Sequence, residues 1–220
     1  MKLYGVEWSI KSKPKLDPNF IPMEQFTRGF LKNAKQPLAI AIEREDECVS
    51  VYDTFIHGTP DMQQADFFYV ERLVKFLLWA RGGFCVTICG NQEVYNHIKS
   101  VYSLDGPRAF DAKTMSDVYE SPFSVRHLPY EQKPAEKESS KPLGGHMDGC
   151  RIGFDAGGSD RKVSAVMDGE VLYSEEVVWS PKTTSDPDYH FNEIVTAMKT
   201  AASKLPRVDA IGISSAGIYV

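Results

Sequence analysis

Apolar and polar residues alternate along two stretches of the chain, and both patterns predict strands. In the first stretch, residues 37–44 and 48–56 alternate on either side of a short acidic turn, which is typical of a β-hairpin. In the second stretch the alternation is interrupted once by a Gly-Gly turn and once by an Asp-Gly turn. The second stretch therefore predicts three strands, near residues 150–155, 162–167 and 170–179.

Helices are predicted where apolar residues recur every three or four positions. Residues 66–80 have this spacing and are followed by Gly82-Gly83, which stops a helix. Asn91 is a suitable N-cap for a second helix, and Asp186-Pro187-Asp188 has the proline and acidic residues that begin a third. The remaining predicted elements are a short helix within 23–35 and two buried strands, 84–90 and 208–214.

The order of these elements predicts two folded units joined by a linker. Residues 1–120 read as β-β-α-β-α, the pattern of an independent α/β domain. Residues 121–148 contain several prolines and a charged run but few residues that build a core, so we expect an extended linker there. Residues 149–220 hold the three-strand pattern, followed by a helix and a strand.

Composition narrows the range of functions. The chain has 220 residues, 42% of them hydrophobic, and a net charge of −5, which disfavours a general affinity for nucleic acid or anionic membranes. No apolar run approaches the roughly 20 residues that a membrane span needs, and the N-terminus lacks the apolar core of a secretory signal. The four cysteines form no disulfide-dense pattern. We therefore expect a soluble, reduced, cytoplasmic protein, and leave its self-association open.

The Gly-Gly turn of the second stretch has the composition of a phosphate-binding loop. Asp155 ends the first predicted strand, and Gly157 and Gly158 follow at the tip of the hairpin. Because glycine has no Cβ, its backbone N–H can approach an anion closely. The carboxylate of Asp155 is positioned where a divalent ion bridges a carboxylate to phosphate oxygens. The alternative is a tight hairpin whose glycines serve only the turn.

Residues 150–220 resemble the start of the actin-like ATPase superfamily. A phosphate loop between two strands, then a third strand, a helix and a fourth strand, is typical of a ribonuclease-H-like half-lobe. The closest resemblance is to the ROK family of bacterial sugar kinases and regulators, which opens with Asp-x-Gly-Gly-Thr/Ser; here the motif is Asp155-Ala156-Gly157-Gly158-Ser159. The strand that ends in Ser214-Ser215-Ala216-Gly217 is similar to a glycine-containing segment of that family. The implied fold class is α/β, an N-terminal ββαβα unit followed by the first part of an actin-type lobe.

The resemblance implies a site for ATP and Mg²⁺. Asp155 would lie near the metal, and Lys162 would add positive charge. On the substrate side, Ser215 and Gly217 are the implied contacts to a small-molecule sugar. The residues that would present N–H groups and a hydroxyl to the β- and γ-phosphates are Gly157, Gly158 and Ser159.

The implied reaction is ATP-dependent phosphoryl transfer to a sugar hydroxyl in the complete protein. The catalytic Asp, zinc motif and adenosine-binding segment of the family lie further downstream than residue 220, so no catalytic residue is identified. Phosphoryl transfer needs groups on both sides of the phosphate, and we therefore expect this chain to be an N-terminal portion that is inactive alone. The alternative is a non-catalytic scaffold or sensor that binds nucleotide or sugar, with residues 1–120 as a partner-binding module. A third interpretation joins both units into one closed domain.

Other candidate sites are weaker. Cys85 and Cys89 lie four apart in a predicted strand, roughly 13 Å along it, too far for one zinc ion. The five histidines are scattered without ligand spacing. Residues 84–90 are faintly similar to the strand-glycine-helix adenosine segment of the superfamily, but an ordinary βα unit is the simpler interpretation. Residues 1–120 lack the basic character of the winged helix found in ROK repressors.

Overall fold

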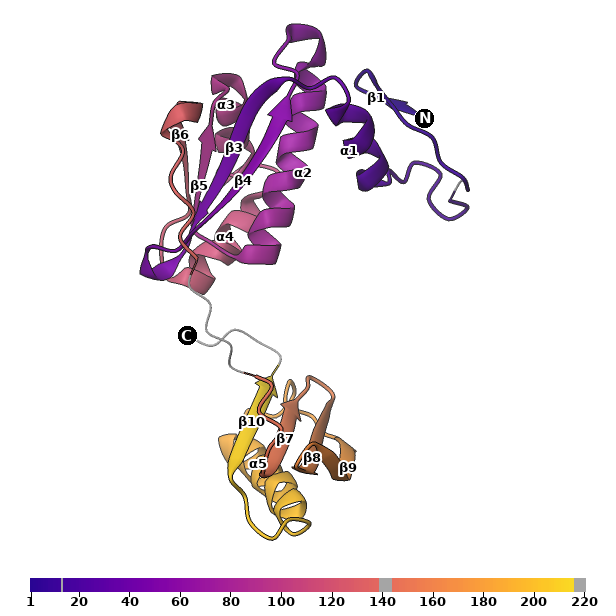
Figure 1. Ribbon diagram of the computed structural model, residues 1–220, viewed down its shortest axis with the longest axis vertical. Helices are drawn as coiled ribbons and strands as arrows, with labels where there is room; N and C mark the ends of the chain where they lie inside the picture. The colour runs from indigo at the N-terminus through magenta and orange to yellow at the C-terminus, as the bar shows by residue number, and fades with distance from the viewer. Residues whose placement is uncertain (13, 139–143, 216–220) are drawn as a thin grey trace. The chain divides into compact units, whose positions relative to one another are not determined.

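The computed structural model describes residues 1–12, 14–138 and 144–215, which fold as two compact units, Met1–Ser140 and Lys141–Val220 (Figure 1). Each unit has a four-stranded sheet and a hydrophobic core of its own. The mixed α/β class expected from the sequence is confirmed.

The first unit is built on a sheet with the strand order β4-β3-β5-β6. Strands β3 (Gln36–Glu43) and β4 (Val49–Ile56) form the predicted antiparallel hairpin. Strand β5 (Cys85–Cys89) pairs antiparallel with β3, and β6 (Ser124–Leu128) pairs parallel with β5. A two-stranded ribbon precedes the sheet, formed by β1 (Lys2–Leu3) and β2 (Val6–Glu7).

Helices cover one face of this sheet, and the alternate strand residues Leu38, Ile40 and Ile42 pack into the shared core. A fourth helix was not expected from the sequence, because its first turn exposes Phe110 and buries Asp111, which inverts the hydrophobic pattern at these two positions. The helices are α1 (Met23–Leu31), α2 (Gln63–Arg81), α3 (Gln92–Val101) and α4 (Ala109–Tyr119), with 3₁₀ turns at Glu45–Glu47, Pro60–Met62 and Tyr130–Gln132.

The structure corrects the expectation of a linker over residues 121–148. Strand β6 belongs to the sheet of the first unit, and residues 129–138, which we call the strap, continue from it across β5 and β3 to β4. There Lys137 exchanges two backbone hydrogen bonds with Val49, of 2.8 and 2.9 Å. The first unit therefore extends to Ser140 and not only to residue 120, and the division at 140/141 lies within the stretch expected to be a linker.

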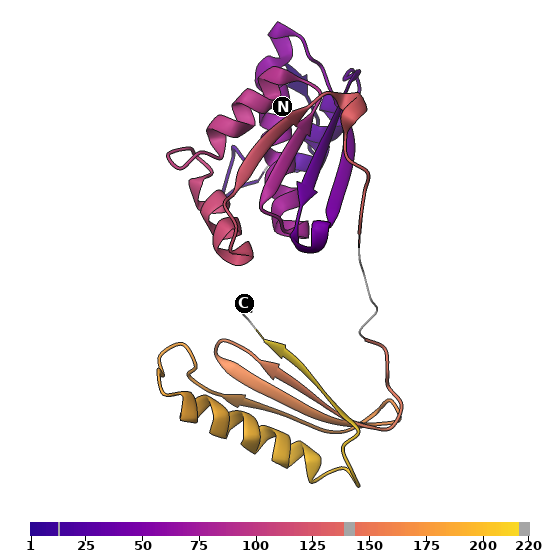
Figure 2. The same ribbon diagram turned by 90° about the vertical axis from the view of Figure 1, so that its left-hand side faces the viewer.

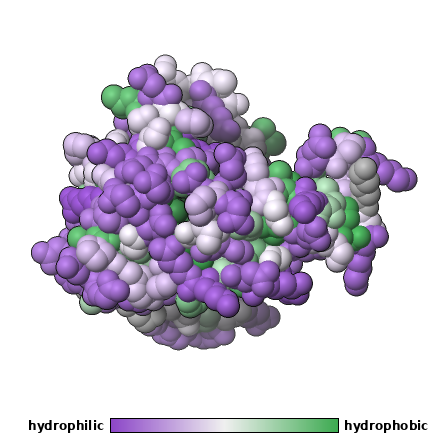
Figure 3. Space-filling view, turned by 90° about the horizontal axis from the view of Figure 1, so that it is seen from above, coloured by the Kyte–Doolittle hydropathy of each residue, from purple (hydrophilic) through white to green (hydrophobic). Residues whose placement is uncertain are grey.

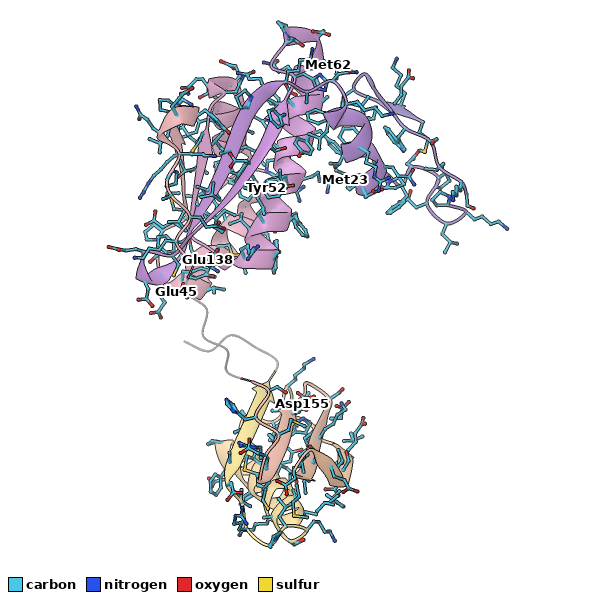
Figure 4. All side chains as sticks on the ribbon, in the orientation of Figure 1. Met23, Glu45, Tyr52, Met62, Glu138 and Asp155 are labelled. Carbon is cyan, nitrogen blue, oxygen red and sulfur yellow. The ribbon has the colours of Figure 1, made fainter. Side chains whose placement is uncertain are left out.

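Polar contacts, not buried apolar residues, hold the strap, which is why its composition resembles that of a linker. Lys133 donates to both carboxylate oxygens of Asp53 at 2.6 Å, and the hydroxyl of Tyr130 donates to Oδ1 of Asp53 at 3.1 Å. At the other end of the strap, Arg44 forms an ion pair with Glu138 (Figure 4).

The second unit has the strand order β10-β7-β8-β9. The hairpin strands pair antiparallel, and the last strand returns parallel to β7 after a helix. This is the order expected of a ribonuclease-H-like half-lobe. The elements are β7 (Cys150–Ala156), β8 (Asp160–Met167), β9 (Glu170–Val178), α5 (Pro187–Ala202) and β10 (Ala210–Ser215).

Helix α5 covers one face of this sheet (Figure 2). Its residues Ala197 and Ala201 are fully buried against Ile152, Phe154 and Val163 of the sheet. Since side chains alternate along a strand, residues Gly153, Asp155 and Ser164 face the opposite, open side.

The predicted helix starts are confirmed. Oδ1 of Asn91 accepts hydrogen bonds from the backbone N–H groups of Glu93 and Val94, at 2.9 and 3.1 Å. Oδ1 of Asp186 accepts from the N–H of Asp188 at 3.0 Å. Both caps follow from local sequence alone.

Among the described residues, none of the helices has the length and apolar character needed to cross a membrane. The face of the molecule seen in Figure 3 is largely hydrophilic, with hydrophobic side chains scattered over it.

Candidate functional site

Asp155 lies at the carboxyl end of β7, where several segments of the second unit meet (Figure 4). Strand β10 runs parallel to β7 and sets Ser214 directly beside Asp155. Strand β9 also ends at this edge, because Val178 pairs with Asp160 at the start of β8. Ligands of open α/β sheets bind outside the carboxyl ends of the strands, so this edge is the natural candidate.

The hydroxyl of Ser214 donates a 2.7 Å hydrogen bond to Oδ1 of Asp155. This contact holds one oxygen of the carboxylate, and no hydrogen bond to Oδ2 is formed within the described residues. Both residues face an open hollow of about 440 Å³ on the side of the sheet away from α5. The hollow is lined by Gly153, Phe154, Asp155, Lys162, Val163, Ser164, Ser174, Gly212, Ile213 and Ser214, among which Asp155 is the only carboxylate.

The loop that follows Asp155 is held by two hydrogen bonds from Trp179. The indole Nε1 of Trp179 donates to the carbonyl of Gly157 at 2.7 Å, and its backbone N–H donates to the carbonyl of Ser159 at 3.1 Å. Trp179 is only 5% exposed. The loop therefore points two carbonyls at the protein, whereas its N–H groups, those of residues 157–159, donate no hydrogen bond within the described part of the chain.

The two glycines are required for different reasons. Neither has a positive φ, so backbone strain does not select them. At Gly157 a Cβ would lie 2.5 Å from the carbonyl oxygen of Asp160, which is backbone and cannot move aside. At Gly158 a Cβ would meet only the end of the Lys182 side chain, at 2.7 Å from Cε and 2.9 Å from Nζ. The tight-turn interpretation thus accounts for Gly157 but not for Gly158.

Lys162 lies opposite Asp155 in the β7–β8 register, but its ammonium group is engaged elsewhere. Nζ donates to Oδ1 of Asp160 at 2.5 Å and lies 3.8 Å from Glu176. The hydrogen bond with Asp160 raises the pKa of Lys162 and lowers the pKa of Asp160. The charge that was expected to serve a phosphate is therefore largely balanced by these carboxylates.

A partly buried ion pair connects β8 to α5. Arg161 is 5% exposed on the helix-facing side of β8, and its Nε lies 2.7 Å from Glu193 of α5. Sequence reasoning missed Arg161, Trp179 and Lys182. The only available signal was Trp179, the single tryptophan of the second unit, at the end of a predicted strand.

Of the two residues expected on the substrate side, Ser215 is the last residue of β10 and pairs with Ala156 in the register. It is thus at the same edge as the loop. Gly217 lies outside the described residues.

The donor set suits Mg²⁺ better than a metal that needs a protein cage. In the described ranges, no group of three or more His, Cys, Asp or Glu side chains is arranged to hold a metal. Mg²⁺ is usually bound by one or two carboxylates together with waters and phosphate oxygens. The carboxylate of Asp155 fits a Mg²⁺ ion whose other ligands are waters and phosphate oxygens.

The strand-glycine-helix segment of the first unit does not offer a comparable anion site. The side chain of Asn91 accepts hydrogen bonds from two N–H groups in the first turn of α3, and Glu93 adds a negative charge in the same turn. Asp66, which is 2% exposed, likewise accepts from the N–H groups of His57 and Gly58, each at 2.8 Å. These donors are already used, which favours an ordinary βα unit.

No protein-family profile matches the chain, and no curated protein matches its sequence. Comparison with solved structures finds an exopolyphosphatase from Cytophaga hutchinsonii, with 9% identity over 82% of this chain and a TM-score of 0.26. It also finds apo pSK41 ParM (10% identity, 86% of this chain and 74% of that chain, TM-score 0.28) and MreB 5 of Spiroplasma citri bound to AMPPNP (10% identity, 66% of this chain and 45% of that chain, TM-score 0.17). The chain spans 64% of the exopolyphosphatase. At TM-scores this low, none of these similarities assigns the chain a family or an activity.

Proposed function

We propose that the second unit binds a nucleotide together with Mg²⁺ at the carboxyl edge of its sheet. The observation that carries the proposal is the carboxylate of Asp155, held by Ser214 at 2.7 Å, next to a loop whose N–H groups are not bonded within the described part of the chain. The loop N–H groups would receive phosphate oxygens. Asp155 would hold Mg²⁺ through Oδ2, directly or through water.

In the complete protein, the proposed reaction is phosphoryl transfer from ATP to a sugar hydroxyl, as in ROK-type kinases. The hollow offers Asp155 as its one carboxylate, and this residue would serve the metal. A base would then have to come from outside the hollow, and transfer also needs positioning and charge on both sides of the phosphate. Unit 2 would therefore supply the nucleotide half of such a site.

Isothermal titration of the chain with Mg-ATP, with and without EDTA, tests the nucleotide site. We expect binding that depends on Mg²⁺ and that Asp155→Asn weakens about tenfold or more, since a carboxylate ligand to the metal is lost. The circular dichroism spectrum of Asp155→Asn should match the wild type, because the side chain lies in an open hollow. Mg-independent binding, or an unchanged affinity in Asp155→Asn, would remove this residue from the site.

A second candidate is a non-catalytic nucleotide-dependent scaffold or sensor. It is favoured by exposed aromatic side chains on the first unit, where Phe76 is 67%, Trp79 is 51% and Phe110 is 73% exposed. Trp79 and Phe110 stack with ring centroids 6.5 Å apart. Large exposed aromatic groups are enriched in protein-binding surfaces.

Turnover separates the two candidates. A coupled assay for ADP release by the complete gene product, run with a panel of aldohexoses, would show sugar-dependent ATP consumption if the protein is a kinase. Nucleotide binding without sugar-dependent turnover would favour the scaffold.

A further inference from the structure

A lysine lies over the glycine loop from the segment that joins β9 to α5. Cε and Nζ of Lys182 approach Gly158 so closely that a Cβ at this position would be 2.7 and 2.9 Å away from them. Lys182 is itself exposed to solvent, and no carboxylate or carbonyl within the described residues forms an ion pair or hydrogen bond with its ammonium group. An unbalanced cation thus lies beside unbonded backbone N–H groups.

The segment that carries Lys182 is fixed on both sides. The N–H of Thr183 donates to the carbonyl of Ser180 at 3.3 Å, which closes a turn with Lys182 at its third position. The N–H of Ser180 donates to the hydroxyl of Tyr189 at 3.0 Å, and the carbonyl of Pro181 lies 3.2 Å from Nε2 of His190.

Tyr189 and His190 both belong to the first turn of α5, and Trp179 joins the start of the segment to the loop. The backbone that presents Lys182 is therefore held by the loop on one side and by the helix on the other. Because this backbone is already held, only the side chain of Lys182 has to be ordered when an anion binds.

The two lysines beside the loop differ in their surroundings. Nζ of Lys162 lies 2.5 Å from a carboxylate oxygen of Asp160 and 3.8 Å from one of Glu176. The end of the Lys182 side chain instead lies beside Gly158. An anion at the loop would have to displace a carboxylate to reach Lys162, but would find the ammonium of Lys182 available.

We propose that Lys182 is a specificity-determining residue that binds the terminal phosphate of a nucleoside triphosphate held on the loop of residues 157–159. This inference rests on the proposed nucleotide site and names the residue that distinguishes a triphosphate from a diphosphate. The loop N–H groups receive the inner phosphate, and Lys182, reaching over Gly158, receives the outer one.

Isothermal titration of the full chain with Mg-ATP, Mg-ADP and inorganic tripolyphosphate tests the proposal. Lys182→Gln should lower the affinity for Mg-ATP and for tripolyphosphate about tenfold, the worth of one charge-assisted hydrogen bond, and should change the affinity for Mg-ADP by less than about twofold. Lys182→Arg should restore part of the loss. Lys162→Gln is the matched control and should keep the wild-type ratio of ATP to ADP affinity.

The outcomes separate this inference from the proposed function. In one outcome the wild type binds tripolyphosphate but neither nucleotide, and Lys182→Gln weakens the binding of tripolyphosphate. The nucleotide assignment then fails, while the role of Lys182 in binding an anion stands. If Lys182→Gln binds all three ligands as the wild type does, or if the wild type binds none of them, the role of Lys182 is overturned. Equal losses for ATP and ADP would also overturn it, because the residue would then not recognise the terminal phosphate. Thermal midpoints of all variants should agree, since Lys182 is exposed.

Discussion

Ser214 and Asp155 are 59 positions apart in the chain, and a 2.7 Å hydrogen bond joins their side chains at the edge of one sheet. The parallel pairing of β10 with β7 creates this contact, because it sets the two residues at the same level of neighbouring strands. The hydroxyl orients Oδ1 of Asp155, so that the proposed metal meets a carboxylate already fixed in position.

Replacing Ser214 tests this orientation. We expect Ser214→Ala to weaken Mg-dependent nucleotide binding about fivefold, because one hydrogen bond of about 1 kcal/mol is lost. Titration calorimetry measures the change. Ser164→Ala, which alters the other end of the hollow, should bind as the wild type does. Equal affinities for Ser214→Ala and the wild type would show that the hydrogen bond does not assist the site.

The two glycines of the loop should respond differently to alanine. In Gly157→Ala the new Cβ would meet the carbonyl oxygen of Asp160 at 2.5 Å, so we expect unit 2 to lose about 1–3 kcal/mol of stability. In Gly158→Ala the Cβ meets only the movable end of Lys182, and stability should stay within about 0.5 kcal/mol of the wild type. In a background with Trp8→Phe and Trp79→Phe, urea unfolding followed by Trp179 fluorescence distinguishes them. The reverse order would mean that the loop can relax at Gly157.

Loosening the strap should expose the sheet face beneath it. Cys89 is fully buried there, and burial raises the pKa of its thiol to about 11, so it should react very slowly with iodoacetamide at pH 8. Lys133→Ala removes the two hydrogen bonds that Lys133 donates to Asp53. It should increase the alkylation rate of Cys89 severalfold, as measured by mass spectrometry. Cys150, buried in the other unit, is the internal control. An unchanged rate at Cys89 would mean that the strap is held without Lys133.

Protonation of His97 should make the free energy of unfolding of the first unit depend on pH. Burial lowers the pKa of His97, although Oε2 of Glu71, itself paired with Arg108, lies 3.4 Å from Nε2. The unfolded chain, with an ordinary pKa of about 6.5, then binds the proton more tightly than the folded one. The free energy of unfolding should therefore fall as the pH drops from 7.5 through about 6.5 to values below it.

His97→Phe keeps a ring on Phe67, against which the imidazole stacks at 4.3 Å, and removes the titration. In a Trp179→Phe background, urea unfolding followed by Trp8 and Trp79 fluorescence should show a weaker pH dependence for His97→Phe. His146→Gln, which changes an exposed residue outside the first unit, should keep the wild-type slope. An equal slope in His97→Phe would assign the dependence to another group.

Local patterns predicted most of the elements because their causes are local. Alternation along β4, β7, β8 and β9 reflects greater burial of one strand face, and the caps at Asn91 and Asp186 depend on residues only two or three positions away. Helix α4 escaped prediction because tertiary contacts bury Asp111, which accepts a 2.7 Å hydrogen bond from Trp79, and leave Phe110 exposed. That inversion depends on a residue 32 positions away.

Local chemistry alone predicts the strand-loop-strand around Asp155, Gly157 and Gly158, since alternation and turn chemistry need no distant partner. The surroundings of that loop depend on contacts made in the folded chain. Pairing across the sheet brought Ser214 to Asp155, the end of β9 brought Trp179 and Lys182 to the loop, and ion pairs turned an apparent linker into the strap. These contacts join residues far apart in the chain, and each one forms only once the sheet of its own unit has formed.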